Sequence, residues 1–171
     1  MDVRTYMEMY SAIHKFCTRH LGKEPREDLY TLLSAYLKKV LSTIHKGAEK
    51  LTKEQLLDYY NEQWSRFIAC SRLNHYLWMY LQRHWLKREL DEGKKVYLIF
   101  DLHLREWKLE MLDRMHENLA ETLLRLIRRQ RDGEYVEQLP RKSFINSVSK
   151  FARTNSVVTY SHVVISDSKK V

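Results

Sequence analysis

The sequence predicts an all-α protein of antiparallel helices, and three observations support this fold class. Glycine and proline are scarce, with four and two residues in a chain of 171, although sheets need such residues in their turns. Apolar side chains recur at helical spacing through most of the chain. Periodic segments are followed by glycines, where a residue of positive φ often ends a helix; these are Gly22, Gly47, Gly93 and Gly133.

The first expected helix runs from about Asp2 to His20 and is apolar on more than one side. Met7 and His14 extend the apolar surface to a second flank. Such a helix is covered on more than one side, by its own domain or by a partner. Its main stripe is Tyr6, Tyr10, Ile13 and Cys17.

The next two helices look like ordinary packing helices. One begins after Pro25 and ends near Lys46, with a single apolar stripe. The other begins at the capping box formed by Thr52 and Gln55. We expect a bend within residues 70–72 to end it.

A helix rich in aromatic residues should follow, over residues 72–92, and Gly93 should end it. One stripe faces the protein's own core and consists of Leu73, Leu77, Leu81 and Trp85. A second stripe consists of Tyr76, Tyr80, Arg83 and Lys87. Because a surface helix needs only one apolar stripe for its own core, the second is free for another contact.

Two further helices are expected, from Val96 to about Met115 and from Glu117 to Arg131. The segment SFINSVSKF can begin one more helix. Residues 153–171 are rich in Ser and Val and show no long stripe. We expect them to form a disordered tail.

The composition limits the possible partners and location. A net charge of +8 suits an acidic protein, a nucleic acid or an anionic membrane surface, without choosing among them. The two cysteines, Cys17 and Cys70, are far apart and form no CxxC pair. A reduced, intracellular protein is therefore expected. We expect it in the cytoplasm and nucleus. No apolar run approaches the length of a membrane span.

Motifs that would indicate catalysis are missing from the sequence. It contains no HExxH motif, no Cys and His at zinc spacing, and no glycine-rich phosphate loop. We interpret His84, Cys17 and Cys70 as packing residues. The sequence thus predicts a protein that is not an enzyme, with no catalytic residue, cofactor or metal site.

Four segments, in order, resemble the cullin family. They are TYMEMYSAIHKFCT, LTKEQLLDYYNEQWSRF, YLQRHWLKRELDEGKKVYLIFDLHLREW and LLRLIRRQRDGE. The first is similar to the family pattern YMELY with a later YCT, and the third to YLNRHW followed by DEG. The wording is nearest to the cullins that scaffold SCF ubiquitin ligases.

This resemblance implies a fold and a partner. Cullin N-terminal regions are stacked five-helix repeats, and the chain would hold the first repeat and the start of the second, over residues 1–152. The first repeat binds a Skp-type adaptor of BTB-like fold together with its F-box receptor. Matched residue by residue, the implied adaptor-binding positions are Tyr6, Met7, Tyr10 and Tyr80. That adaptor class is acidic, which suits the positive charge of the chain.

The resemblance does not extend to the C-terminal cullin region, which recruits the RING subunit. We therefore expect no RING partner, and a truncated, cullin-like module that acts as a decoy or is a fragment. A fragment that folds poorly without its neighbouring repeats is a further reading. The alternative function is a helical nucleic-acid binder, suggested by the basic residues Arg125, Arg128, Arg129, Arg131, Arg141 and Lys142.

Overall fold

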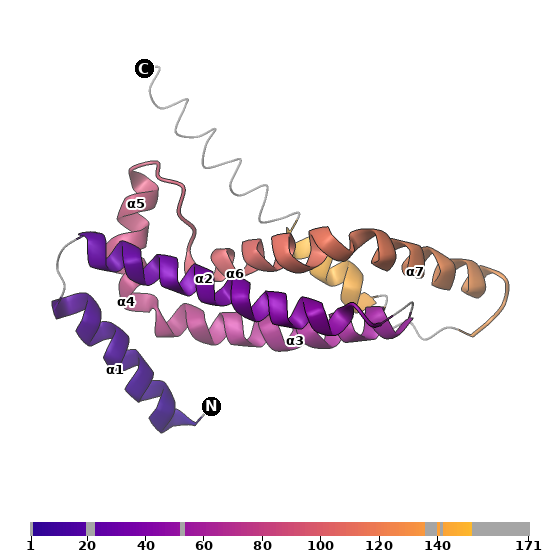
Figure 1. Cartoon of the computed structure of the whole chain (residues 1–171), viewed down its shortest axis with the longest axis horizontal. Helices are drawn as coiled ribbons and strands as arrows, with labels where there is room; N and C mark the ends of the chain where they lie inside the picture. The colour runs from indigo at the N-terminus through magenta and orange to yellow at the C-terminus, as the bar shows by residue number, and fades with distance from the viewer. Residues whose placement is uncertain (1, 20–22, 52–53, 136–139, 141, 152–171) are drawn as a thin grey trace, which may run out of the picture.

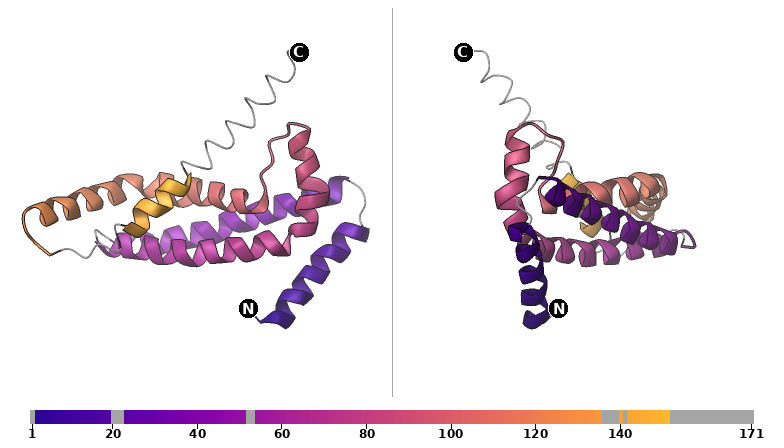
Figure 2. Two further views of the ribbon diagram at one scale, coloured as in Figure 1. Left: turned by 180° about the vertical axis from the view of Figure 1, so that it is seen from behind. Right: turned by 60° about the vertical axis from the view of Figure 1, so that its left-hand side comes forward.

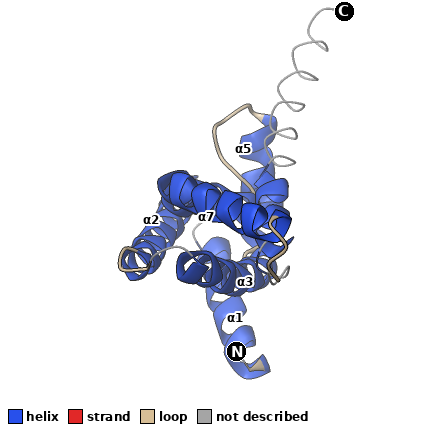
Figure 3. Ribbon diagram, turned by 90° about the vertical axis from the view of Figure 1, so that its right-hand side faces the viewer, coloured by secondary structure: helices blue, strands red, loops and turns tan. Residues whose placement is uncertain are grey.

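All regular structure in the described part of the chain is helical, which confirms the predicted fold class. The computed structural model describes residues 2–19, 23–51, 54–135, 140 and 142–151. No strand occurs among them, as the colouring of Figure 3 shows. None of the helices in these ranges is long and apolar enough to cross a membrane.

Three long helical rods lie side by side and form the body of the molecule (Figure 1). Two of them are α2, Lys23–Ala48, and α3, Glu54–Leu77. The third is continuous and consists of α6, Ile99–Trp107, the π-helix η2, Lys108–Leu112, and α7, Asp113–Arg131. The end-on view in Figure 3 shows α2, α3 and α7 around a shared centre.

Short helical segments gather at one end of these rods. Helix α1, Val3–Arg19, crosses that end at an angle and contacts α3 and α4. After α3 the chain continues through α4, Met79–Leu81, the π-helix η1, Gln82–Leu86, and α5, Lys87–Asp91. Figure 2 shows α1 and α5 projecting away from the rods at this end.

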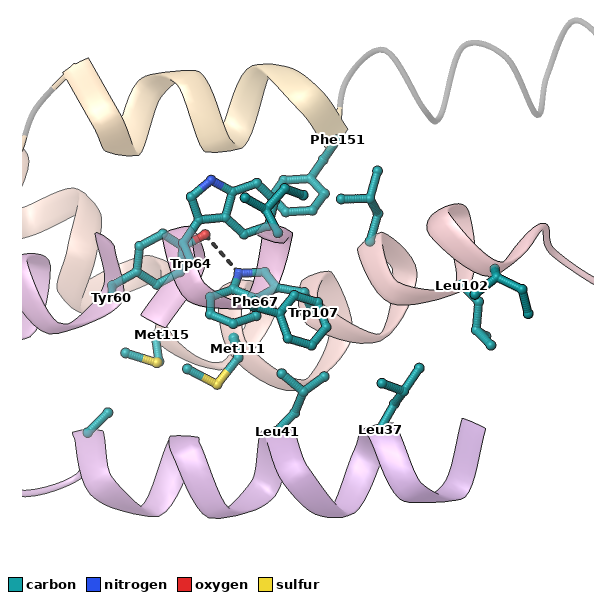
Figure 4. Close-up of a cluster of buried hydrophobic side chains, with 14 of the residues drawn as sticks. Leu37, Leu41, Tyr60, Trp64, Phe67, Leu102, Trp107, Met111, Met115 and Phe151 are labelled. Atoms are coloured by element: carbon teal, nitrogen blue, oxygen red, sulfur yellow. Dashed lines mark hydrogen bonds between the residues drawn. The ribbon is translucent and has the colours of Figure 1, made fainter. Parts of the chain in front are cut away.

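The core is centred on Trp107 of α6, which is fully buried (Figure 4). Its ring lies 4.8 Å from that of Phe67 and 5.3 Å from that of Trp64, between centroids. A helix over residues 142–151 covers this cluster, because Phe151 contacts Trp64 with centroids 5.3 Å apart. Leu37, Leu41 and Met111 close the opposite side.

A buried chain of hydrogen bonds ties three of these elements together. Trp107 Nε1 donates to the Tyr60 hydroxyl over 3.1 Å. The Tyr60 hydroxyl and Ser147 Oγ are 3.3 Å apart, and Ser147 Oγ donates to the Phe144 carbonyl over 2.7 Å. Since an indole can only donate and the Ser147 proton is already used, Tyr60 must donate to Ser147. Every member of the chain is therefore satisfied.

The predicted bend at residues 70–72 is wrong, because α3 passes straight through this segment. The buried Ser71 hydroxyl bonds to the Phe67 carbonyl at 2.7 Å, so its polar group is satisfied inside the helix. The helix is interrupted instead at Trp78, where φ is −94° and ψ is 14°. Leu73, predicted for the core stripe, is 44% exposed.

The predicted break between Met115 and Glu117 is also wrong. The rod is helical from Ile99 to Arg131, and Met115 is buried within it. Residues 96–98, expected at the start of this helix, lie outside it. No glycine or proline occurs between Ile99 and Arg131 to end the helix.

Two of the four glycines end helices as predicted. Gly93 and Gly133 have φ values of 77° and 90° and follow α5 and α7. The prediction for Gly47 is wrong, because this residue lies inside α2. A Cβ at Gly47 would lie 2.6 Å from the Tyr59 hydroxyl oxygen, so a side chain at this position would displace the Tyr59 ring. Gly22, Thr52 and the tail 153–171 lie outside the described residues.

Candidate protein-docking surface

Four rings form a line that crosses from α1 to the segment after α3. The Tyr10 and His14 rings stack with centroids 6.2 Å apart. His14 meets Tyr80 edge-on at 4.6 Å, and Tyr80 lies 4.4 Å from His84. This row, Tyr10, His14, Tyr80 and His84, is called the ring line below. It joins two segments that are far apart in sequence into one surface.

Helix α1 is positioned by its C-terminal end. Cys17 is fully buried, and the buried Arg26 of α2 donates from Nη2 to the Cys17 carbonyl over 3.0 Å. This bond satisfies a carbonyl in the last turn of α1, where no intrahelical donor remains. Arg26 thereby ties the C-terminal end of α1 to α2.

The turn at Trp78 and the π-helix η1 set the orientation of Tyr80. A π-helix accommodates an extra residue per turn and so shifts the faces of the residues around it. Leu81 and Trp85 are buried, while His84 is exposed on the other side. Tyr80 itself is half-buried. It therefore keeps part of its ring accessible while packing on its neighbours.

Gln82 holds this segment against the rods. Its Nε2 donates to the His75 carbonyl at the end of α3 over 2.7 Å. Its Oε1 accepts a hydrogen bond from the Ile99 backbone amide at the start of α6, over 3.2 Å. Gln82 is buried, so both bonds are shielded from water. A single polar side chain thus fixes the ends of two rods relative to η1.

A second polar contact holds the loop between α5 and α6. The Tyr30 hydroxyl donates to the Tyr97 carbonyl over 3.2 Å and accepts from the Tyr97 amide over 3.0 Å. Burial raises the pKa of Tyr30 to about 12, so this hydroxyl keeps its proton at neutral pH. The guanidinium of Arg105 lies 5.2 Å from the centroid of the Tyr97 ring. Loop residue Tyr97 is therefore held on both sides.

The resemblance-derived site residues lie at or near this surface. Tyr10 and Tyr80 are members of the ring line and are joined through His14. Tyr6 is half-buried, and Met7 is 53% exposed, one turn before Tyr10. Their role in adaptor binding stays a prediction.

The sequence reasoning assigned no binding role to His14 and His84. His14 was placed on a flank of α1, and His84 was interpreted as a packing residue. Each follows a tyrosine of the ring line by four residues, which puts the pair on one helix face. That spacing was the available signal. The contact between His14 and Tyr80 had no signal, because it joins distant segments.

Exposed basic side chains lie on two of the elements that carry the ring line and on α5, which follows them. Lys15, Arg83 and Lys87 are exposed on α1, η1 and α5. On α1, Arg4 forms an exposed ion pair with Glu8, with Nε and Oε1 3.0 Å apart. Arginine and aromatic side chains together are typical of protein interfaces with an acidic partner.

A buried histidine outside the ring line has a polar neighbour at each ring nitrogen. His103 is buried, with Nε2 2.9 Å from Asn74 Nδ2 and Nδ1 2.6 Å from the Ile99 carbonyl oxygen. Burial lowers its pKa, so the ring is neutral at pH 7. Within the described ranges, no group of three or more His, Cys, Asp or Glu residues could hold a metal ion.

The basic cluster at the end of α7 is partly neutralised. Arg129 bonds to Glu54 at 2.7 Å and to Glu134 at 2.6 Å. Arg125 lies 3.9 Å from the same Glu54 carboxylate. These ion pairs leave less positive charge for a nucleic acid than the sequence alone suggested.

Comparison with known proteins identifies the fold family. The family model described as "Cullin alpha solenoid domain" matches residues 1–166. Cullin-1 of Caenorhabditis elegans is 30% identical over 161 residues, covering 80% of this chain and 20% of the relative. Cullin-1 of Dictyostelium discoideum is 36% identical over 121 residues, covering 70% of this chain and 16% of the relative.

A third relative, Cullin-1 of Schizosaccharomyces pombe, is 30% identical over 156 residues, covering 80% of this chain and 20% of the relative. The chain thus spans about a fifth or less of the length of these relatives. The matched residues include α1 and the whole aromatic segment that carries the ring line. The chain belongs to the cullin family, and the predicted cullin-repeat fold is confirmed.

Proposed function

We propose that the ring line and the adjoining Tyr6 and Met7 bind an acidic adaptor of the Skp type, so that the chain acts as a non-catalytic, scaffold-like module. The contact between α1 and α4 supports this proposal most directly. His14 lies 4.6 Å from Tyr80, so the two helices offer one continuous aromatic surface instead of two separate patches. Partly exposed aromatic and methionine side chains are the residue types that dominate interface energetics.

Calorimetric titration of the full chain with a purified Skp-type adaptor tests the proposal. Replacing Met7 or Tyr80 by alanine should weaken binding by about 30-fold each, since an interface anchor contributes roughly 2 kcal/mol. Tyr36→Ala is the matched control, because Tyr36 is 64% exposed on α2 and takes no part in the ring line. Absence of binding, or equal losses in the control, would contradict the proposal.

Salt provides a second test of the same contact. The chain has a net charge of +8, so association with an acidic adaptor should be steered electrostatically. We expect the association rate to fall as ionic strength rises, while the dissociation rate changes little. Stopped-flow or surface-based kinetics at two salt concentrations separates the two rates.

We further infer that residues 1–171, taken on their own, bind the adaptor and compete with a longer cullin for it, which is a decoy role. The resemblance assigns RING recruitment to a cullin region outside the matched residues. Added to a preformed complex of adaptor and longer cullin, the chain should release the cullin in proportion to its concentration. It should retain no RING subunit in a pull-down. Retention of a RING subunit would contradict the decoy role.

A basic nucleic-acid binder is the second candidate, favoured by exposed Arg128 and Arg131 at the end of α7. Its binding would fall steeply with salt, with a slope set by the number of phosphates contacted. A gel-shift titration with Arg128→Ala and Arg131→Ala tests it. The expected location in the cytoplasm and nucleus stays a prediction.

A further inference from the structure

A pocket of about 320 Å³ opens between the last turns of α3 and the start of α6. Most of its wall is apolar, and the lining residues are Arg72, His75, Tyr76, Leu98, Phe100 and Asp101. A hollow of this size can receive one large apolar side chain. The Tyr76 side chain is 57% exposed, so aromatic surface at this pocket is in contact with water. Burial of that surface by another apolar group is therefore favourable.

The two walls of the pocket are held together by one buried side chain. Gln82 Nε2 donates to the His75 carbonyl on α3 over 2.7 Å, and Gln82 Oε1 accepts from the Ile99 amide on α6 over 3.2 Å. Ile99 lies between the lining residues Leu98 and Phe100. Because Gln82 is buried, water does not compete for these two bonds. The pocket is therefore preformed, and a ligand does not have to order its walls on binding.

Two cationic side chains from different helices lie near each other beside this pocket. Arg72 is exposed on α3 and lines the pocket. Burial lowers the pKa of Lys150, in helix 142–151, and the positive charge of Arg72 lowers it further, so the two side chains are close. The Lys150 ammonium also lies 5.6 Å from the centroid of the Trp64 ring on α3. Since two like charges repel, an anion that contacts both of them is attracted to this place.

Among the residues that line the pocket, the acidic side chain is less exposed than Arg72. Asp101 is half-buried, and burial raises the pKa of its carboxyl group, while the nearby His75 opposes that rise. A cationic ligand group is repelled by Arg72 and Lys150, whereas an anionic group beside them is attracted. The Asp101 carboxylate can accept a hydrogen bond from a backbone amide, which a peptide ligand carries. The charges therefore favour an acidic peptide.

We propose that the pocket binds a peptide segment of a partner protein in which a large apolar side chain is followed by acidic residues. The apolar side chain fills the hollow against Tyr76 and Phe100, and the acidic residues contact Arg72 and Lys150. Asp101 accepts a hydrogen bond from the backbone of the segment. This site does not rest on adaptor binding by the ring line, so the two proposals can fail separately.

Fluorescence polarisation of a labelled peptide with the full chain tests this site. The probe is a short peptide of glycine and serine that carries one phenylalanine followed by two aspartates. One control peptide has lysines in place of the aspartates, and another has alanine in place of the phenylalanine. We expect each control peptide to bind about tenfold more weakly than the probe or worse, because one loses the charge attraction and the other loses the apolar burial.

Reversing one charge at the pocket should reverse the preference between the peptides. Arg72→Glu should weaken the aspartate peptide by about tenfold and strengthen the lysine peptide. Arg66→Glu is the matched control, because Arg66 is an exposed arginine of the same helix and undergoes the same change of charge. Arg66 lies six residues before Arg72, which places it on a different face of α3. Its replacement should leave the order of the peptides unchanged.

A second pair of variants tests the apolar wall. Tyr76→Ala removes an aromatic side chain from the pocket and should weaken the probe by about tenfold. Tyr36→Ala is the control, since Tyr36 is an exposed tyrosine on α2 and does not line the pocket. Both replaced side chains are exposed, so thermal melts followed by circular dichroism should show that both variants remain folded.

Three outcomes would overturn the proposal. One is that the probe fails to bind at millimolar concentration, and another is that the three peptides bind alike. The third is that inorganic phosphate displaces the labelled probe as well as the unlabelled probe does, because the two cations then bind an anion without the pocket. Protection of residues 98–101 from hydrogen exchange by the probe, lost in Tyr76→Ala, would support the proposal.

Discussion

The ring of His14 meets the ring of Tyr80 edge-on, with centroids 4.6 Å apart, and this contact joins α1 to the segment after α3. Edge-to-face pairs of this kind contribute about 0.5–1.5 kcal/mol beyond simple burial. Cys17 is the only buried residue of helix α1. The orientation of α1 therefore depends strongly on a few contacts of this type.

Replacing His14 by alanine should loosen α1 without unfolding the rods. We expect faster amide exchange in residues 6–14 and weaker adaptor binding by several-fold, because α1 must then be ordered on binding. His14→Phe keeps an edge-to-face ring and should restore both properties. Hydrogen-exchange mass spectrometry and calorimetry measure them. Unchanged exchange in the alanine variant would show that other contacts orient α1.

Tyr60→Phe should destabilise the whole fold. The change removes the acceptor for Trp107 Nε1, 3.1 Å away, inside a fully buried site. An unsatisfied buried donor costs about 1–3 kcal/mol, seen as a lower urea midpoint at constant slope. Tyr59→Phe is the control, since its hydroxyl makes a single, half-buried bond of 3.0 Å to the Ile44 carbonyl. A loss in Tyr60→Phe no larger than in the control would argue against the buried chain.

The effect of Gly47→Ala should depend on Tyr59. The new methyl group would lie 2.6 Å from the Tyr59 hydroxyl oxygen, so in the native background it displaces that ring and lowers stability. In a Tyr59→Phe background the obstruction is gone. There the helix preference for alanine should raise stability by up to about 1 kcal/mol. Urea titrations of the native protein, Gly47→Ala, Tyr59→Phe and the double variant give the coupling energy between the two substitutions, which should be well above zero. Additive effects would contradict the close approach.

Stability should fall on mild acidification because of His103. Burial lowers its pKa in the folded protein below the ordinary value of 6.5. Below about pH 6.5 the unfolded chain binds a proton that the folded chain excludes, so acidification favours unfolding. The contribution of neutral His103 is fully present above that pH and is lost as pH falls towards the folded-state pKa.

Urea midpoints at pH 7.5, 6.5 and 5.5 measure this dependence. His103→Gln removes the titrating group and should flatten the pH dependence, whatever its effect on stability at pH 7.5. The exposed His116 provides the control, and His116→Gln should leave the profile as it is. A steep acid profile that persists in His103→Gln would assign the proton to another group.

Periodicity in the sequence was sufficient for the fold class and for most helices. Leu77, Leu81 and Trp85 are buried as their spacing predicted, and Gly93 and Gly133 end helices. Periodicity did not predict where the helices are interrupted and where they continue. The turn at Trp78 has no glycine or proline to mark it, and α3 continues through Ser71 because a helix can satisfy that hydroxyl.

Sequence reasoning identified some residues of the candidate surface but not the contact that joins them. The family resemblance pointed to Tyr10 and Tyr80, and the structure places them in one row. Their connection through His14 depends on the turn at Trp78 and on the π-helix η1. The geometry of both follows from tertiary packing, which includes the hydrogen bonds of Gln82 to His75 and Ile99. Contacts between residues that are 66 positions apart leave no periodic trace in one sequence.

The buried chain from Trp107 through Tyr60 to Ser147 has a consequence for proteolysis. Asn61 also donates to the Pro140 carbonyl over 2.9 Å, so helix 142–151 is attached to α3 at several points. A protease that cuts just after Gly133 would sever the backbone but leave this helix seated on Trp64. The nicked protein should migrate as one particle on a native gel and separate into two peptides only in detergent.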